Sequence, residues 1–186
     1  MKALVRLNDL LALCEKVIGA ALGLVVVGLV LLNVVTRTWG NALFWTDEAA
    51  IAAMVWMAFL GTSLGLYHKQ LVAVTLLPDL LPENMRRGFE IATDTLVLIF
   101  ALTLLALAWK WFDPVTLALS GFDTKAFSQK TFNFIYAETT TTLGVQKFWL
   151  WLVMLVFSFN LTIHALTNLL AHRTAASGPR AVQSAA

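Results

Sequence analysis

Four long apolar runs constrain this sequence most strongly, since a chain that carries them cannot fold as an ordinary soluble domain. Residues 49–67 contain no Asp, Glu, Lys or Arg. At about 1.5 Å per residue they are long enough to cross a hydrocarbon core of about 30 Å. The sequence predicts an all-α integral membrane protein whose membrane domain covers residues 1–172, with four transmembrane helices at about 17–36, 47–67, 90–110 and 148–171.

Composition supports the same class of protein. The chain is 59% hydrophobic and 13% charged, whereas a soluble domain carries about 25% charged residues. The single cysteine, Cys14, excludes an intramolecular disulfide and a cysteine metal cluster. A net charge of +2 gives no indication of a nucleic-acid partner.

Shorter segments flank the predicted spans. Residues 70–82 are apolar, but they are too short to cross a membrane and contain Pro78, so they are expected to lie along the membrane interface. Residues 1–16 mix leucines with charged residues, which favours an amphipathic lead-in on the membrane surface. Residues 173–186 have the composition of a disordered tail.

A long connection, residues 110–147, joins the third and fourth predicted spans. Its apolar residues are predicted to dock a short helix on the membrane surface. They are Phe127, Phe132, Phe134, Ile135 and Tyr136.

The distribution of Lys and Arg predicts the orientation. Eight of these residues fall on the side of the termini and of the second loop, and five fall on the opposite side. The positive-inside rule therefore places both termini in the cytoplasm and the 110–147 connection on the opposite side of the membrane.

The start of the second span carries the first candidate site. Thr46 is a candidate N-cap, and Asp47 and Glu48 fall in the first helical turn, where the helix dipole favours negative charge. Three interpretations remain open: capping with a salt bridge to Arg37, a paired-carboxylate site, or contact with a partner subunit. Trp45 is typical of a membrane interface.

A row of small residues follows along the same span. Ala49, Ala53, Gly61 and Gly65 recur at helical spacing, interrupted by Met57. Small side chains allow close approach of a second helix. The row is therefore predicted to be a docking groove.

Polar residues within the other spans are the second set of candidates. Asp94 lies inside the third span, and Asn160 and His164 lie inside the fourth. Asp94 and His164 fall at similar predicted depth, so we expect them to share a hydrogen bond. His68 and His164 allow a haem-bearing membrane anchor of a respiratory enzyme as an alternative. No nucleotide, metal or nucleophile motif is present, so the sequence predicts neither enzymatic activity nor a cofactor.

An ordered set of residues resembles the DctQ-like small membrane subunit of the tripartite ATP-independent periplasmic (TRAP) transporters. An Arg ends the first span, a Trp and an acid precede an alanine-rich helix, and a valine-rich surface segment ends in proline. An internal Trp and a Phe-Leu-Gly lie within that helix. In chain order these features are Arg37, Trp45, Glu48, Trp56, Phe59-Leu60-Gly61 and residues 71–82.

The resemblance implies a non-enzymatic subunit of a sodium-driven importer of organic acids in the bacterial inner membrane. Its partners would be a large permease subunit, a periplasmic substrate-binding protein and membrane lipid. In this interpretation Arg37 neutralises Glu48, and Trp45 anchors contact with the permease. A self-sufficient small transporter is the remaining alternative, although the middle of the spans offers few polar side chains.

Overall fold

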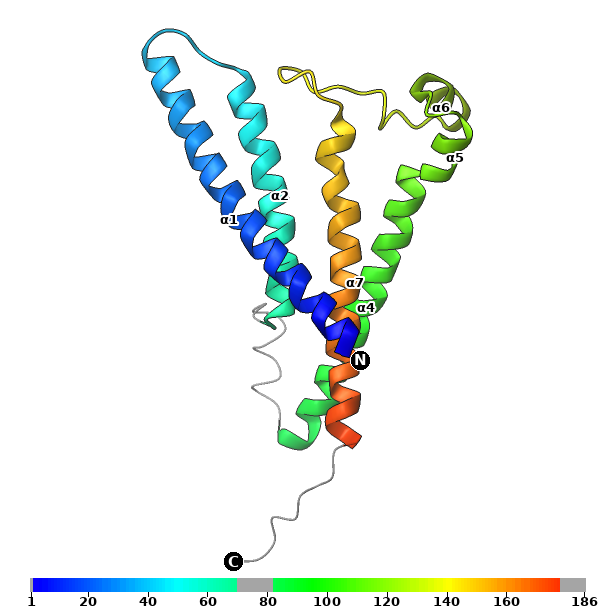
Figure 1. Ribbon diagram of the computed structural model, residues 1–186. Coiled ribbons are helices and arrows are strands. Elements are labelled where there is room, and N and C mark those ends of the chain that lie inside the picture. Colours follow the sequence, from blue (N-terminus) through cyan, green and yellow to red (C-terminus); the bar gives the residue numbers. More distant parts are fainter. Residues whose placement is uncertain (1, 70–81, 178–186) are drawn as a thin grey trace, which may run out of the picture.

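Six helices and no strand form the part of the chain that the computed structural model describes, residues 2–69 and 82–177 (Figure 1). Four of the helices are long and apolar enough to span a membrane. The predicted all-α fold with four spans is therefore confirmed. The helices are α1 (Lys2–Thr38), α2 (Trp45–Tyr67), α4 (Glu83–Phe112), α5 (Pro114–Leu119), α6 (Thr124–Thr131) and α7 (Lys147–Ser177).

The long helices pack as two pairs, α1 with α2 and α4 with α7. Helix α7 also contacts α2 and α1, and this contact joins the pairs. Figure 1 shows the pairs close together near the N-terminus and spread apart at the opposite end. We call these the terminal end and the distal end; the distal end holds the α1–α2 turn, α5 and α6.

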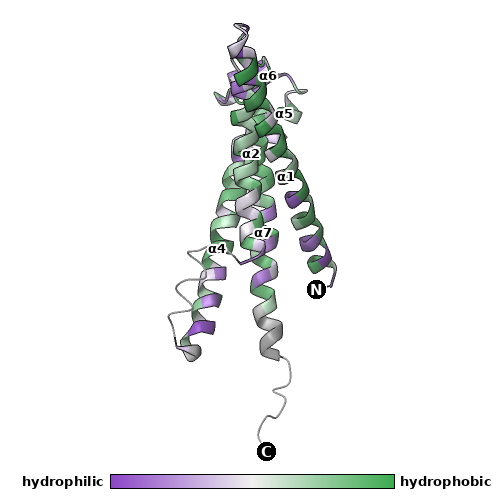
Figure 2. Cartoon of the chain, turned by 90° about the vertical axis from the view of Figure 1, so that its left-hand side faces the viewer, coloured by the Kyte–Doolittle hydropathy of each residue, from purple (hydrophilic) through white to green (hydrophobic). Residues whose placement is uncertain are grey.

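The long helices consist mostly of hydrophobic residues, whereas hydrophilic residues are concentrated at the two ends of the structure and in part of α7 (Figure 2). The most hydrophobic window of α1 is not buried inside the molecule at all. Leu24, Val27 and Leu31 are among its exposed residues. Such a surface is stable in hydrocarbon and unstable in water, which agrees with a membrane location.

Two hydrophobic clusters hold the described residues together. The first lies where α2, α4 and α7 meet and includes the alanines Ala101 and Ala165, whose small side chains allow close helix contact. The second lies at the distal end, around the completely buried Phe127. Its other buried members are Phe112, Ile135 and Tyr136.

Several helix boundaries differ from the sequence prediction. The predicted surface lead-in, residues 1–16, is wrong, because α1 runs without a break from Lys2 to Thr38. No Gly or Pro interrupts its first turns, and Asn8, Ala12 and Glu15 form a stripe that is buried. Helix α7 continues to Ser177, beyond the predicted start of a tail at 173. The predicted interfacial segment lies, apart from Pro82, outside the described residues.

The 110–147 connection forms two short helices, α5 and α6, and a buried cluster, rather than a single surface helix. Phe127, Ile135 and Tyr136 do not face the membrane, because they form the distal hydrophobic cluster. Phe132 and Phe134 are exposed, and their predicted contact with the membrane surface stays a prediction. An isolated antiparallel bridge between Thr139 and Gln146 then leads into α7.

Candidate functional site

A group of polar side chains joins α1 to the start of α2 at the distal end. We call Asn33, Arg37, Thr46 and Asp47 the distal cluster. The Arg37 Nη2 atom lies 2.7 Å from Asp47 Oδ2. The Asn33 amide donates to Thr46 Oγ1 at 2.9 Å and also to Asp47 Oδ1. A hollow of about 300 Å³ lies beside these four residues.

The distal cluster corrects two expectations. Arg37 pairs with Asp47, so the predicted Arg37–Glu48 ion pair is wrong, and of the capping interpretation only the salt bridge to Arg37 is confirmed, for Asp47. Thr46 is not the N-cap, because α2 begins at Trp45 and Phe44 occupies the cap position without a side-chain bond. Consecutive helical residues point about 100° apart, so Asp47 and Glu48 cannot both face α1.

Glu48 instead holds a distant loop. Its carboxylate accepts from the backbone amides of Thr141, Thr142 and Leu143 at 3.0, 2.8 and 3.0 Å, and from the Thr142 hydroxyl. We call Glu48 and these three residues the distal latch. The latch connects the first turn of α2 to the loop that enters α7, and nothing in the sequence pattern indicated it.

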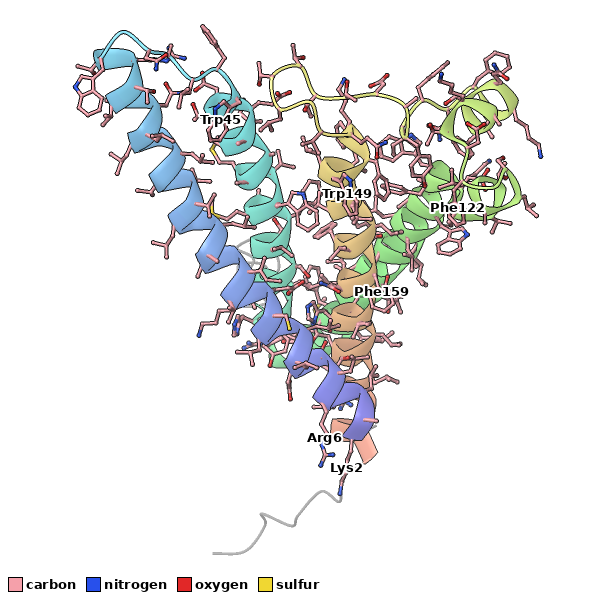
Figure 3. All side chains as sticks on the ribbon, turned by 45° about the horizontal axis from the view of Figure 1, so that its top comes forward. Lys2, Arg6, Trp45, Phe122, Trp149 and Phe159 are labelled. Atoms are coloured by element: carbon pink, nitrogen blue, oxygen red, sulfur yellow. The ribbon has the colours of Figure 1, made fainter. Side chains whose placement is uncertain are left out.

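The predicted small-residue groove does not form a single face. Ala53 is buried inside the molecule, Ala49 and Gly65 are half-buried, and Gly61 is exposed. A Cβ atom added at Gly61 would meet nothing within 4 Å. Each step of four residues turns about 40° past a full helical turn, so the row winds from the interior to the surface. Trp45 is partly exposed at the distal end, where Figure 3 labels it.

A second polar group lies inside the bundle, where α1 meets α7. We call Asn8, Glu15, Asn160 and His164 the buried cluster. His164 Nδ1 lies 2.7 Å from Asn8 Oδ1, and His164 Nε2 lies 3.1 Å from Glu15 Oε2. The Asn160 amide donates to Glu15 Oε1 at 2.8 Å. All four residues are buried.

The geometry of the buried cluster requires a proton between Glu15 and His164. Nε2 and Oε2 are both acceptors when deprotonated, and two bare acceptors at this distance would repel each other. With one proton between them, the imidazole and the carboxylate form a hydrogen bond. This bond, with the one from the Asn160 amide, lowers the cost of burying the Glu15 carboxyl group within a membrane-spanning bundle.

Helix α2 closes this region from a third direction. The Tyr67 hydroxyl donates to Asp9 Oδ1 at 2.9 Å, and the Tyr67 ring packs edge-on against His164, with 5.4 Å between ring centroids. Four residues earlier on α2, the hydroxyl of Ser63 is buried and has no hydrogen-bond partner among the described residues.

Asp94 lies apart from the buried cluster. Its carboxylate is 3.4 Å from Lys69 Nζ. The predicted bond between Asp94 and His164 is wrong, because both ring nitrogens of His164 face residues of α1. The haem alternative would require His164 to release one of these two partners. Among the described residues, no group of three or more His, Cys, Asp or Glu side chains is placed to hold a metal ion.

Sequence reasoning found Asn160 and His164 but missed their partners on α1. The signal was present, since Asn8, Ala12 and Glu15 recur at helical spacing on one face. This stripe also fits an amphipathic surface segment, which is what the sequence predicted for residues 1–16.

A comparison with known protein families gives a match. Residues 26–175 match the family described as "Tripartite ATP-independent periplasmic transporters, DctQ component". The match covers most of the chain, including the distal third of α1 and the whole of α2, α4 and the 110–147 connection. No curated protein matches the chain.

Proposed function

The chain belongs to the DctQ family, the small membrane component of tripartite ATP-independent periplasmic transporters, and we propose that it scaffolds the large permease subunit of a sodium-driven importer of organic acids. Its proposed partners are that permease and a periplasmic substrate-binding protein. The tripartite nature of the family supports both partners.

One observation carries the scaffold proposal: the buried polar side chains are used to join helices. Within the described residues, Ser63 supplies the one buried side-chain oxygen or nitrogen that lacks a hydrogen-bond partner. Glu15, Asn160 and His164 bond to one another rather than lining a path. A transport route needs polar groups that face a cavity and exchange partners with the substrate. An arrangement of satisfied contacts favours a rigid support.

We further propose the bacterial inner membrane as the location, with the terminal end in the cytoplasm and the distal end in the periplasm. The excess of Lys and Arg on the side of the termini supports this orientation. In this orientation the distal cluster, the distal latch and Trp45 face the periplasm, on the side where a substrate-binding protein docks.

The docking face for the permease is proposed on α2 around Gly61. Gly61 is exposed within an apolar helix, and the space beyond it is open. A glycine on a membrane-exposed face permits a neighbouring helix to approach closely, and this is how helices associate without a hydrophobic driving force between them.

Replacing Gly61 with Leu tests this face. The added side chain meets open space in the isolated subunit, so the unfolding temperature of the chain alone should not fall. Recovery of the permease with the tagged subunit should drop at least tenfold, which corresponds to about 1.4 kcal/mol. Ala106→Leu on α4, another exposed small residue, is the matched control and should leave recovery unchanged. Equal recovery for both variants and wild type would remove Gly61 from the interface without affecting the scaffold proposal itself.

A further inference from the structure

Helix α5 exposes large apolar side chains and buries none. Val115, Leu119 and Phe122 are 57%, 78% and 72% exposed, the last in the turn that follows the helix. Val115 and Leu119 are four residues apart and share one face of α5. So much apolar surface is unfavourable in water, and it belongs to a short helix that is separate from α4.

The orientation of this face is fixed by the other side of α5. Asp113 Oδ1 accepts from the Thr116 amide at 3.2 Å and caps the helix. Leu117 packs against the distal hydrophobic cluster. In the same cluster the Tyr136 hydroxyl donates to the Phe112 carbonyl at 2.6 Å. Burial, with the nearby charge of Asp113, raises the pKa of Tyr136, so the phenol keeps the proton that it donates. The apolar face therefore cannot turn inward without breaking these contacts.

The depth of α5 follows from its neighbours. A single residue, Asp113, separates it from the end of α4. The last turns of α4 and the first turns of α7 carry exposed tryptophans, which are typical of the membrane–water interface. These are Trp109, Trp111, Trp149 and Trp151. The rings of Trp111 and Trp151 are 5.7 Å apart between centroids, so the two helices place tryptophan at one level.

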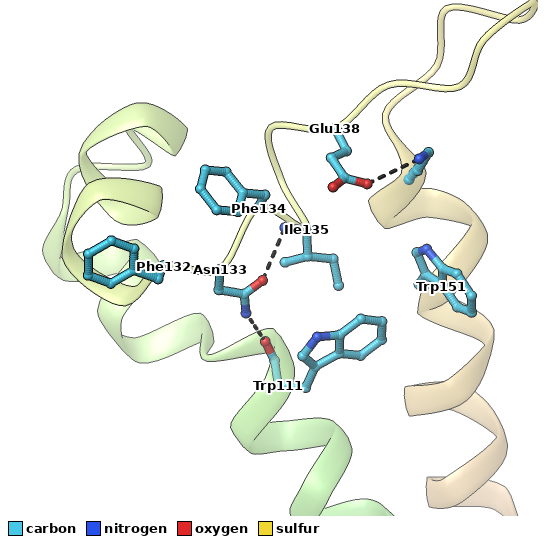
Figure 4. A pocket seen from close by; sticks show the side chains of 8 residues that line it. Trp111, Phe132, Asn133, Phe134, Ile135, Glu138 and Trp151 are labelled. Atoms are coloured by element: carbon cyan, nitrogen blue, oxygen red, sulfur yellow. Dashed lines mark hydrogen bonds and ion pairs between the residues drawn. The ribbon is translucent and has the colours of Figure 1, made fainter.

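A hollow of about 410 Å³ lies between the distal ends of α4 and α7. Aromatic side chains, among them Trp111, Phe134 and Trp151, line it together with the Glu138–Lys147 ion pair (Figure 4). Figure 3 shows Phe122 and Trp149 toward the distal end, opposite Lys2 and Arg6. Two exposed lysines, Lys110 and Lys125, flank α5 along the chain.

We propose that α5 is an interfacial anchor that binds the lipid surface of the leaflet at the distal end. Val115, Leu119 and Phe122 lie among the upper acyl chains. Lys110 and Lys125 lie at the lipid phosphates, where their positive charge is complementary. The anchor adds a second membrane contact next to that of α4. It thereby fixes the depth of the distal hydrophobic cluster relative to the membrane surface.

Nitroxide accessibility measures this arrangement directly. Full-length protein with Cys14→Ser is labelled at Leu119→Cys, and independently at Val115→Cys and Phe122→Cys, in vesicles of phosphatidylethanolamine and phosphatidylglycerol. Oxygen concentrates in lipid, whereas a water-soluble nickel chelate does not enter it. At all three positions we expect collisions with oxygen to exceed collisions with the nickel reagent. Gln129→Cys, an exposed polar position on α6, is the control and should give the opposite ratio.

Two outcomes would overturn the proposal. A label at Leu119 that collides more with the nickel reagent than with oxygen would place α5 in water. A label that becomes inaccessible to both reagents when the large permease subunit is added would mean that protein, rather than lipid, covers this face. Continued oxygen accessibility in the assembled complex supports the lipid anchor.

Discussion

Two glutamates, Glu15 and Glu48, each join parts of the chain that are far apart in sequence, but in opposite surroundings. Glu15 is 3% exposed and bonds to side chains of α7 within the bundle. Glu48 lies at the distal end and bonds to backbone amides of a loop. The same carboxylate therefore serves as a helix-to-helix contact in one place and as a loop holder in the other.

The difference lies in what competes with each contact. Water competes with the bonds of Glu48, so losing them releases a loop and leaves the helices packed. No water replaces the partners of Glu15, so losing them leaves a charge or a polar group buried without compensation. The comparison predicts a global effect from the buried cluster and a local effect from the distal latch.

The largest effect is expected at the buried cluster. His164→Leu leaves the Glu15 carboxylate without its proton-sharing partner and should lower the free energy of unfolding by about 3–5 kcal/mol. The double variant Glu15→Leu, His164→Leu removes the buried carboxylate and the imidazole together and should recover part of this loss, although Asn8 and Asn160 lose these partners. Unfolding in detergent micelles measures both variants. A double variant as unstable as the single one would show that shape, rather than charge, matters at this site.

An intermediate and local effect is expected at the distal latch. Glu48→Gln removes the charged acceptor of three amides, so hydrogen exchange at Thr141, Thr142 and Leu143 should accelerate while the unfolding temperature stays close to that of wild type. Glu138→Gln, which alters a nearby exposed ion pair with Lys147, is the control and should not change exchange at these amides. A large fall in unfolding temperature for Glu48→Gln would mean that Glu48, like Glu15, contributes to the global stability of the fold.

The smallest effect is expected at the Arg37–Asp47 ion pair. Both side chains are more than half exposed, and exposed pairs contribute about 0.2–1 kcal/mol. Arg37→Ala should lower stability by no more than this, and the difference from wild type should shrink at high salt. Asn33→Leu should cost more, because it leaves the buried Thr46 hydroxyl without its donor. A larger loss of stability for Arg37→Ala than for Asn33→Leu would contradict the view that exposed contacts contribute less than buried ones.

The same contrast explains what the sequence could predict. The four spans follow from apolar runs, which depend on composition over a short window. The Arg37–Asp47 contact crosses one short turn, so the sequence indicated an ion pair of Arg37 with the start of α2, but Glu48, the partner predicted from the resemblance, was wrong. Glu48 and Thr142 are far apart along the chain and have no shared pattern. Asn8 and Glu15 were missed because a polar stripe that faces a neighbouring helix has the same spacing as one that faces water.

Uptake into liposomes tests the central claim most directly. Liposomes that contain this chain alone should show no uptake of labelled organic acids, with or without a sodium gradient. Adding the large permease subunit and the binding protein should give uptake that requires sodium. Sodium-dependent uptake by the chain alone would contradict the conclusion that its polar side chains serve to join helices.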